Sequence, residues 1–226
     1  MTTKTKTANA YIDGFNFYHG SVKLSPALKW LDLDALCESL LRGYQLVRVS
    51  YYTARVRDQP NDPAQSQRQD DYLRALGSRP RIEIVFGQFQ KKKSTVVLPP
   101  GTTVELTDGS QATLAAGQMV RGRTWEEKGS DVNLGTDLSW DAATGTIGAA
   151  LVISNDLDLQ RPITRAIATG VEVIVVNPHQ RTNRRPSLQG SDTRNLKRGD
   201  LRRCQFPDEV TLADGQTVVR RPASWR

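Results

Sequence analysis

The stretch that decides the fold is Gly148-Ala-Ala-Leu-Val-Ile-Ser154, followed directly by Asn155-Asp-Leu-Asp158. Its apolar run is short enough for one strand, and it lacks the alternation of apolar and polar residues that a half-buried strand shows. We therefore expect a strand that is buried on both faces. Residues 171–176, Val-Glu-Val-Ile-Val-Val, have the same character. Strands of this kind are typical of a parallel sheet that helices cover on both sides.

Strand and helix patterns alternate on both sides of this stretch. In chain order we predict strand 8–13, helix 31–41, strand 46–54, helix 63–76, strand 81–89, helix 131–143, strand 148–154, helix 161–168 and strand 171–176. This alternation predicts an α/β protein with three layers and a central, mostly parallel sheet. Residues 95–125 interrupt it, because Pro99-Pro-Gly101 and Asp108-Gly109 lie between Val- and Thr-rich runs. We expect an inserted β-hairpin there.

The 226 residues are enough for one domain with additions. We assign residues 1–200 to this domain, with the insertion at about 95–125, and residues 201–226 to a basic C-terminal extension. The extension contains Val-Thr-Leu-Ala-Asp-Gly at 210–215, which repeats the pattern of Val-Glu-Leu-Thr-Asp-Gly at 104–109. Two occurrences favour a second hairpin over a repeat array.

The composition excludes several classes of protein. No apolar run approaches the roughly 20 residues that a membrane-spanning helix needs, and the first residues lack the apolar region of a secretory signal. The two cysteines, Cys37 and Cys204, exclude a disulfide scaffold and a cysteine-rich zinc site. We therefore expect a cytoplasmic protein that does not associate with membranes.

Acidic residues follow the predicted strands at the points where each strand ends. Asp13 follows the first strand, and Asp156 and Asp158 follow the buried strand at 148–154. Asp131 opens a helix on which it lies within about 60° of Leu134, Leu138 and Ala142, the apolar and inward face. In an open parallel sheet, ligands bind beyond the carboxyl ends of the strands. We therefore expect these four acids to lie at one site.

Clustered carboxylates repel one another, and a hard divalent cation offsets that cost. Mg²⁺ and Mn²⁺ prefer oxygen ligands, and such an ion can activate a water molecule for attack on a phosphodiester. The formal net charge of +7, nearly all of it in residues 177–226, also favours a polyanionic partner. The combination predicts phosphodiester hydrolysis. Each acid also has a purely structural interpretation, as a turn residue or as a helix cap.

Three phrases of the sequence together resemble the NYN family of the PIN-like ribonuclease superfamily. They are Tyr11-Ile-Asp-Gly-Phe-Asn-Phe-Tyr-His-Gly20, Glu127-Lys-Gly-Ser-Asp-Val-Asn-Leu-Gly-Thr-Asp137 and Ile153-Ser-Asn-Asp-Leu-Asp-Leu159. Tyr51-Tyr-Thr-Ala54 and Val85-Phe-Gly87 add to the resemblance, which extends over roughly residues 8–200. It implies a PIN-like, Rossmann-like α/β fold and a metal-dependent endoribonuclease.

The resemblance also implies roles for individual residues. Asp13, Asp131, Asp156 and Asp158 would be catalytic and would bind Mg²⁺ or Mn²⁺. The supporting residues would be Asn16, Ser154, Lys128 and Asp137: two hydrogen-bond partners, a phosphate contact and an outer acid. We expect the basic C-terminal part to grip RNA through Arg181, Arg184, Arg185, Lys197, Arg198, Arg202 and Arg203.

Alternatives remain open at this point. A non-catalytic RNA-binding or scaffold protein that keeps a PIN-like pocket would account for the basic charge and the insertion, but it has no need for four clustered acids. Toprim domains carry Glu where this chain has Asp13, and haloacid-dehalogenase-type phosphatases need an acid where it has Phe15. A homodimer stays open, because inserted hairpins often make contacts between chains.

Overall fold

The structure is a computed structural model that describes residues 5–59, 61–106, 108–179 and 187–226. Two compact units make up the chain. The first unit comprises Met1–Gln88 and Gly129–Arg226, and the second is the inserted unit Phe89–Lys128. None of the described helices is long and apolar enough to cross a membrane.

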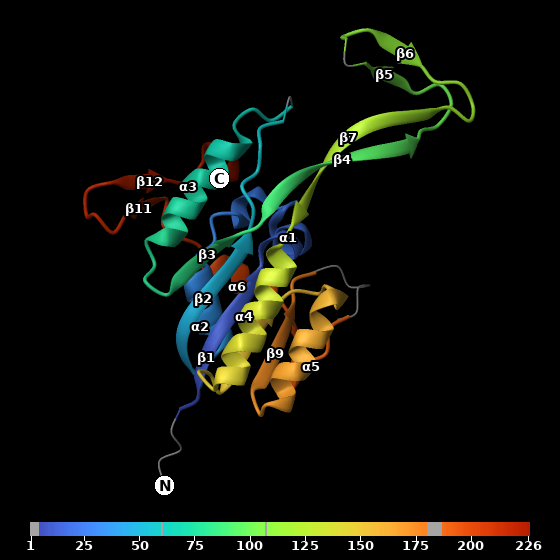
Figure 1. Cartoon of the computed structure of the whole chain (residues 1–226). Helices are drawn as coiled ribbons and strands as arrows, with labels where there is room; N and C mark the ends of the chain where they lie inside the picture. Colours follow the sequence, from blue (N-terminus) through green and yellow to red (C-terminus); the bar gives the residue numbers. More distant parts are fainter. Residues whose placement is uncertain (1–4, 60, 107, 180–186) are drawn as a thin grey trace. The chain divides into compact units, whose positions relative to one another are not determined.

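The centre of the first unit is a six-stranded sheet with the order β10-β9-β8-β1-β2-β3 (Figure 1). All five strand pairings are parallel. The strands are β1 (Thr7–Asp13), β2 (Gln45–Thr53), β3 (Ile82–Phe86), β8 (Ala149–Ile153), β9 (Glu172–Asn177) and β10 (Asp192–Asn195). The prediction of an α/β fold with a central parallel sheet is therefore confirmed.

The order of the strands reverses next to β1. The chain first adds β2 and β3 on one side of β1, and later adds β8, β9 and β10 on the other side. The carboxyl ends of all six strands meet along one side of the sheet, which we call the carboxyl edge. Ligands of open α/β sheets bind at this edge, where the strand order reverses. The ends of β1 and β8 are therefore the place to look for a site.

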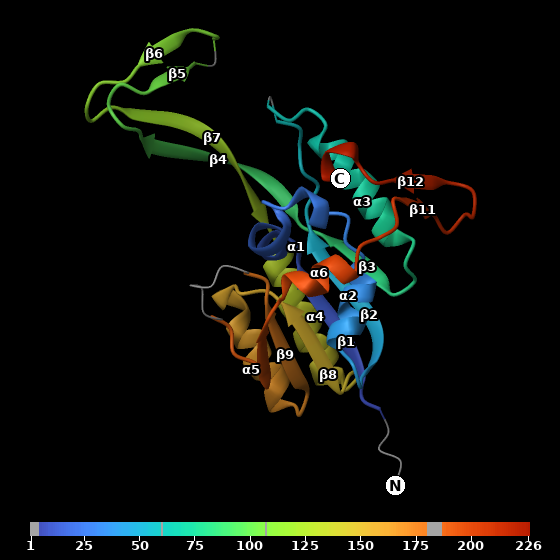
Figure 2. The same cartoon turned by 180° about the vertical axis from the view of Figure 1, so that it is seen from behind.

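Helices cover both faces of the sheet, as Figures 1 and 2 show. Along β8, Leu151 and Ile153 belong to one core cluster, whereas Ala150 and Val152 belong to the other. Both sets are buried, which explains why this strand lacks polar alternation. The helices on the first face are α2 (Leu33–Leu40), α3 (Gln65–Gly77) and α6 (Arg198–Arg203), and those on the second are α4 (Ser130–Thr144) and α5 (Gln160–Ala168).

Short helical turns connect these elements near the carboxyl edge and on the first face. They are α1 (Gly14–Phe17), the π-helix η1 (Tyr18–Val22) and the 3₁₀ turns η2 (Pro26–Leu28), η3 (Leu157–Leu159) and η4 (Ala223–Trp225). The sequence pattern did not predict α1, η1, α6 or β10. Each of these elements is short. The sequence of β10 is Asp-Thr-Arg-Asn, which contains no apolar residue, so a search for periodic apolar residues cannot detect this strand.

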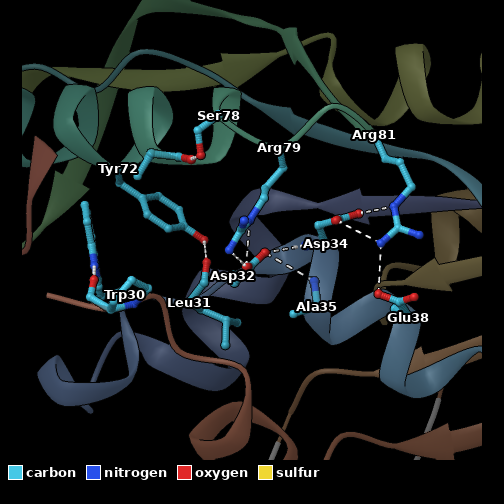
Figure 3. Close-up of polar contacts among 12 residues, drawn as sticks. Trp30, Leu31, Asp32, Asp34, Ala35, Glu38, Tyr72, Ser78, Arg79 and Arg81 are labelled. Atoms are coloured by element: carbon cyan, nitrogen blue, oxygen red, sulfur yellow. Dashed lines mark hydrogen bonds and ion pairs between the residues drawn. The ribbon is translucent and has the colours of Figure 1, made fainter. Parts of the chain in front are cut away.

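Two buried carboxylates hold α2 against the segment that follows α3 (Figure 3). Asp32 caps α2 by accepting hydrogen bonds from the backbone of Asp34 and Ala35, and its second oxygen accepts from Arg79 Nε at 2.8 Å. Arg81 grips Asp34 with two parallel bonds of 2.8 and 3.0 Å. The negative partners of Arg81 raise the pKa of its guanidinium. The negative charges of Asp32 and Asp34 are therefore paired with arginines of the same unit.

Aromatic rings attach the last residues of the chain to the same face. The Trp30 ring lies 5.8 Å from Phe206 and 6.2 Å from Trp225, and Tyr72 lies 6.0 Å from Trp225. Between these rings, β11 (Glu209–Thr211) and β12 (Val218–Arg220) pair as an antiparallel hairpin. The C-terminal residues thus contribute Phe206, Val210 and Val219 to the core.

The inserted unit contains four strands. They are β4 (Gln88–Val97), β5 (Thr103–Glu105), β6 (Gln111–Thr113) and β7 (Met119–Lys128), paired as β4 with β7 and β5 with β6. The hairpin expected at 95–125 is thus the outer part of a longer ribbon. The strand predicted at 81–89 ends at Phe86, and Gly87 separates it from β4. The three lysines at 91–93 lie in β4. Because they are charged, the sequence pattern does not indicate a strand there.

We predict that Asp32→Ala lowers the free energy of unfolding by about 2–3 kcal/mol, because the variant loses a helix cap and leaves Arg79 without its carboxylate. Denaturant unfolding measures the loss. Glu38→Ala is the matched control, since Glu38 is 65% exposed and shares Arg81 with Asp34. We expect a change within about 0.5 kcal/mol for Glu38→Ala. Equal losses in the two variants would contradict the assignment of Asp32 as the anchor.

Candidate active site

Asp13 ends β1, the strand beside which the order of the sheet reverses. Its side chain is 4% exposed, and donors approach its carboxylate from two directions. Oδ1 accepts from the backbone N–H of Asn16 at 2.9 Å, which caps α1, and Oδ2 accepts from Ser154 Oγ at 2.8 Å. Because Ser154 follows β8, the Asp13 carboxylate joins the ends of two neighbouring strands. Hydrogen bonds of this kind favour the charged form of a buried carboxylate.

Ser154 links Asp13 to the next acid. Its fully buried hydroxyl donates to Asp13 and accepts from the backbone N–H of Asp156 at 3.1 Å. Asp156 is half-buried and caps the η3 turn by accepting from the backbone of Asp158 at 3.1 Å. The Asp158 side chain itself is exposed. The structure thus joins Asp13 and Ser154 by their side chains and Asp156 to Ser154 by its backbone N–H, while the backbone N–H of Asp158 bonds to the Asp156 carboxylate.

Asn16 and Asn155 form a second bridge between the two strand ends. The side-chain oxygen of Asn16 accepts from the backbone N–H of Asn155 at 3.0 Å. Asn155 in turn accepts from the backbone of Ser187 at 2.6 Å and lies 3.3 Å from its hydroxyl through Nδ2. Sequence reasoning missed Asn155, although it stands between Ser154 and Asp156. An amide directly after a buried strand was the available signal.

The backbone after Asp13 passes very close to β2. A Cβ atom added at Gly14 would lie 2.5 Å from the Tyr52 carbonyl oxygen and 2.9 Å from the Tyr51 ring, so glycine is required there. Burial raises the pKa of Tyr51 to about 12, a hydrogen bond with Thr53 opposes this, and the negative charge of Asp13 adds to it. Tyr51 therefore stays neutral beside the acid. Its side chain is buried in the first core cluster.

Asp131 lies in the first turn of α4 and is half-buried. Leu134, Leu138 and Ala142 are buried in the second core cluster, which confirms the inward face that the helical period predicts. The start of α4 lies at the carboxyl edge, because α4 contacts η3 and because Gly129 lies next to Gly87, just beyond β3. Asp131 thus shares this edge with Asp13 and Asp156.

Two other acids of α4 are engaged with buried tyrosines. Tyr52 donates to Asp137 Oδ2 at 2.9 Å, and Tyr11 donates to Asp141 Oδ2 at 2.5 Å. Burial, together with the negative charge and hydrogen bond of each acid, raises the pKa of both phenols. Arg48 also donates to Asp141, whose role the sequence pattern did not reveal. The Asp137 carboxylate is therefore a hydrogen-bond partner of the buried Tyr52 hydroxyl.

The predicted RNA contacts fall into three groups. Lys128 ends β7 in the inserted unit and pairs with Glu126 at 3.2 Å. Four exposed cations accompany α6: Lys197, Arg198, Arg202 and Arg203. Lys197 follows the carboxyl end of β10, and Arg203 pairs with Asp200 at 2.5 Å. Arg181, Arg184 and Arg185 lie outside the described residues.

The donors at the edge suit a hard cation, because they are carboxylate, hydroxyl and amide oxygens. Within the described residues, no three Asp, Glu, His or Cys side chains come together as a ligand group for a metal ion. A Mg²⁺-type ion, however, is usually held by one or two carboxylates and completes its shell with waters and substrate phosphates. Asp13 and Asp156, of which Asp13 bonds to Ser154 through its carboxylate and Asp156 through its backbone N–H, offer the one or two carboxylates that this smaller ligand set needs.

Comparison with known proteins finds one similar sequence and one similar solved structure. The chain is 29% identical over 243 residues to the 6-hydroxy-3-succinoylpyridine 3-monooxygenase HspA of Pseudomonas putida, with 95% of this chain and 74% of that protein covered. A crystal structure of a protein of unknown function from Vibrio parahaemolyticus aligns with a TM-score of 0.43 at 15% identity, over 88% of this chain and 98% of that one.

The family comparison covers all the acids of the candidate site. The model of the NYN domain matches residues 8–194, a range that contains Asp13, Asp131 and Asp156 as well as the inserted unit. This match extends over much more than half of the 226 residues, and on that basis the chain belongs to the NYN domain family.

Proposed function

We propose that this protein is a metal-dependent endoribonuclease centred on Asp13. The observation that carries the proposal is the Asp13–Ser154–Asp156 connection at the carboxyl edge, beside the point where the strand order reverses. The NYN family is of nuclease type within the PIN-like superfamily, which supports hydrolase activity. The exposed cations Lys197 and Arg198 near the same edge support an anionic substrate.

Asp13 and Asp156 would hold Mg²⁺ or Mn²⁺, with Asp131 and Asp158 as further acids of the same edge. The bound ion would supply activation of a water molecule and neutralisation of charge on the phosphodiester. The protein's own contribution is orientation. Ser154 Oγ and the Asn16 backbone fix both oxygens of Asp13, which sets the direction in which the remaining lone pairs point.

The basic residues would bind the RNA backbone on either side of the cleaved bond. We propose this role for Lys197, Arg198, Arg202 and Arg203, and also for Arg181, Arg184 and Arg185. Arg203 shares its charge with Asp200, so we expect it to contribute less than Arg202. Phosphate contacts of this kind position a substrate without reading its sequence.

Hydroxylation of an aromatic ring is a second candidate function. The observation that favours it is the similarity, along 95% of the chain, to a protein named as a 3-monooxygenase. Such a reaction consumes O₂ and a two-electron reductant. Oxygen uptake with NADH and 6-hydroxy-3-succinoylpyridine, without RNA turnover, would favour this candidate. Salt-sensitive RNA binding with neither activity would favour a non-catalytic RNA-binding protein.

We predict that the protein cleaves labelled single-stranded RNA with Mg²⁺ or Mn²⁺, that EDTA stops cleavage, and that Asp13→Asn lowers the rate at least about 100-fold. The variant keeps the shape of the side chain and removes its charge. We expect RNA affinity, measured in EDTA, to stay equal or to rise, because a negative charge facing the anion is gone.

Asp192→Asn is the matched control for Asp13→Asn. Asp192 begins β10, at the edge of the sheet opposite to Asp13, and its pair with Arg194 is exposed. We expect this variant to cleave at the wild-type rate. Full activity of Asp13→Asn, or activity that survives EDTA, would contradict the proposed chemistry.

We predict that Ser154→Ala lowers kcat about 10- to 100-fold with little change in KM for RNA, and that it raises the metal concentration needed for half-maximal rate. The reason is that Asp13 loses the hydroxyl donor that orients its Oδ2. Steady-state kinetics across a Mn²⁺ titration measures both effects. Ser50→Ala, which also removes a fully buried strand hydroxyl bonded to a carboxylate, should leave the metal titration unchanged.

A further inference from the structure

The inserted unit presents a two-stranded ribbon, β4 paired with β7, that has almost no core of its own. Among its described residues, Leu114 is the only hydrophobic side chain that is buried. Apolar side chains along the ribbon are exposed, with Val97 at 67% and Met119 at 65%. Two-stranded ribbons are marginally stable in water unless one face is covered. A ribbon of ten residues on each strand therefore points to a binding partner.

The two faces of the ribbon differ in chemistry. Successive side chains of a strand point to opposite faces, so Phe89, Lys91 and Lys93 share one face of β4. Lys91 Nζ lies 5.1 Å from the centre of the Trp125 ring, which places Trp125 of β7 on that face too. Arg121, four residues before Trp125, has the same orientation. We call this set the Lys91 face.

The opposite face, which we call the Lys92 face, is held together by ion pairs. Lys92 Nζ lies 3.0 Å from Glu126 Oε2, and Lys128 Nζ lies 3.2 Å from Glu126 Oε1. These two cations lower the pKa of Glu126. The Lys92 face therefore satisfies much of its charge within the ribbon.

The Lys91 face is not balanced in this way. Lys91, Lys93 and Arg121 are exposed, and among the described residues no ion pair joins any of the three to a carboxylate. The alternation adds one acid to this face, Glu127, next to the end of β7. The face thus combines an excess of positive charge with an aromatic ring that is 38% exposed at Trp125.

Cations that bind phosphates and aromatic rings that stack on bases are the two parts of a single-strand-binding surface. We propose that the Lys91 face binds single-stranded RNA, with phosphates on Lys91, Lys93 and Arg121 and a base stacked on Trp125. This inference rests on RNA as the substrate class in the proposed function. Duplex RNA fits less well, because its bases are stacked internally and its major groove is too narrow for side chains. A second copy of the chain fits less well too, since two Lys91 faces would repel each other.

The test is RNA binding by the full-length protein in EDTA, which separates binding from cleavage. Fluorescence anisotropy with a labelled single-stranded RNA is read at several salt concentrations. For Lys91→Ala/Lys93→Ala we expect about tenfold weaker binding. We also expect the slope of log K against log salt to shrink by about 1.4, since each phosphate contact on a single strand contributes about 0.7. Trp125→Ala should weaken single-strand binding roughly tenfold and leave duplex binding nearly unchanged.

Lys92→Ala is the matched control, because it removes a neighbouring exposed lysine from the opposite face. We expect its affinity and salt slope to equal those of the wild type, with thermal melts confirming that all variants fold. Wild-type binding by the double variant, or equal losses in Lys92→Ala and the double variant, would overturn the proposal. So would a dimer, seen by analytical ultracentrifugation, that dissociates when the Lys91 face is changed. If the double variant loses RNA binding but the wild type does not cleave RNA, the Lys91 face remains supported as an RNA-binding surface and the proposed nuclease activity is contradicted.

Discussion

The hydrogen bond from Ser154 to Asp13 ties the ends of two parallel strands that lie side by side but are separated by most of the chain. Three features of the carboxyl edge are connected with this contact. It fixes the direction of the Asp13 carboxylate, it brings Asp156 to the same place through the Ser154 hydroxyl, and it leaves Asn16 within reach of Asn155. The parallel sheet makes the contact possible, because the carboxyl ends of its strands lie on one side even when the strands are distant in sequence.

Much of this edge could be predicted from the sequence because it depends on local patterns. The apolar run at Ala149–Ile153 identifies a strand buried on both faces, and the acids that follow it must then lie at its carboxyl end. What could not be predicted depends on long-range partners. Asp141 is an ordinary helical residue until Tyr11 and Arg48 are placed against it, and the order of the strands determines that placement.

The boundaries of the insertion show the same limit from another side. Strands are recognised by β-branched and aromatic residues in alternation, and the Lys run of β4 has neither, so pairing with β7 is what makes it a strand.

The fold by itself does not determine the chemistry of the site. A sheet edge of this type hosts many reactions, and the side chains that reach it decide between them. The acids and amides around Asp13, rather than the six strands, therefore determine which chemistry this edge supports.

The aromatic contact between Trp30 and Trp225 has a consequence for how the chain acquires its structure during synthesis. The face of the sheet that carries α2 and α3 cannot be completed until residue 225 has left the ribosome. The reason is that the ring of Trp30, near the start of the chain, packs against the ring of Trp225, near the end of the sequence. Contacts of such sequence separation slow folding, since the entropy of closing the loop precedes the gain from packing. Until then, the nascent chain lacks the Trp225 ring that packs against Trp30 and Tyr72. Chaperones that bind exposed aromatic side chains would bind this protein at that stage.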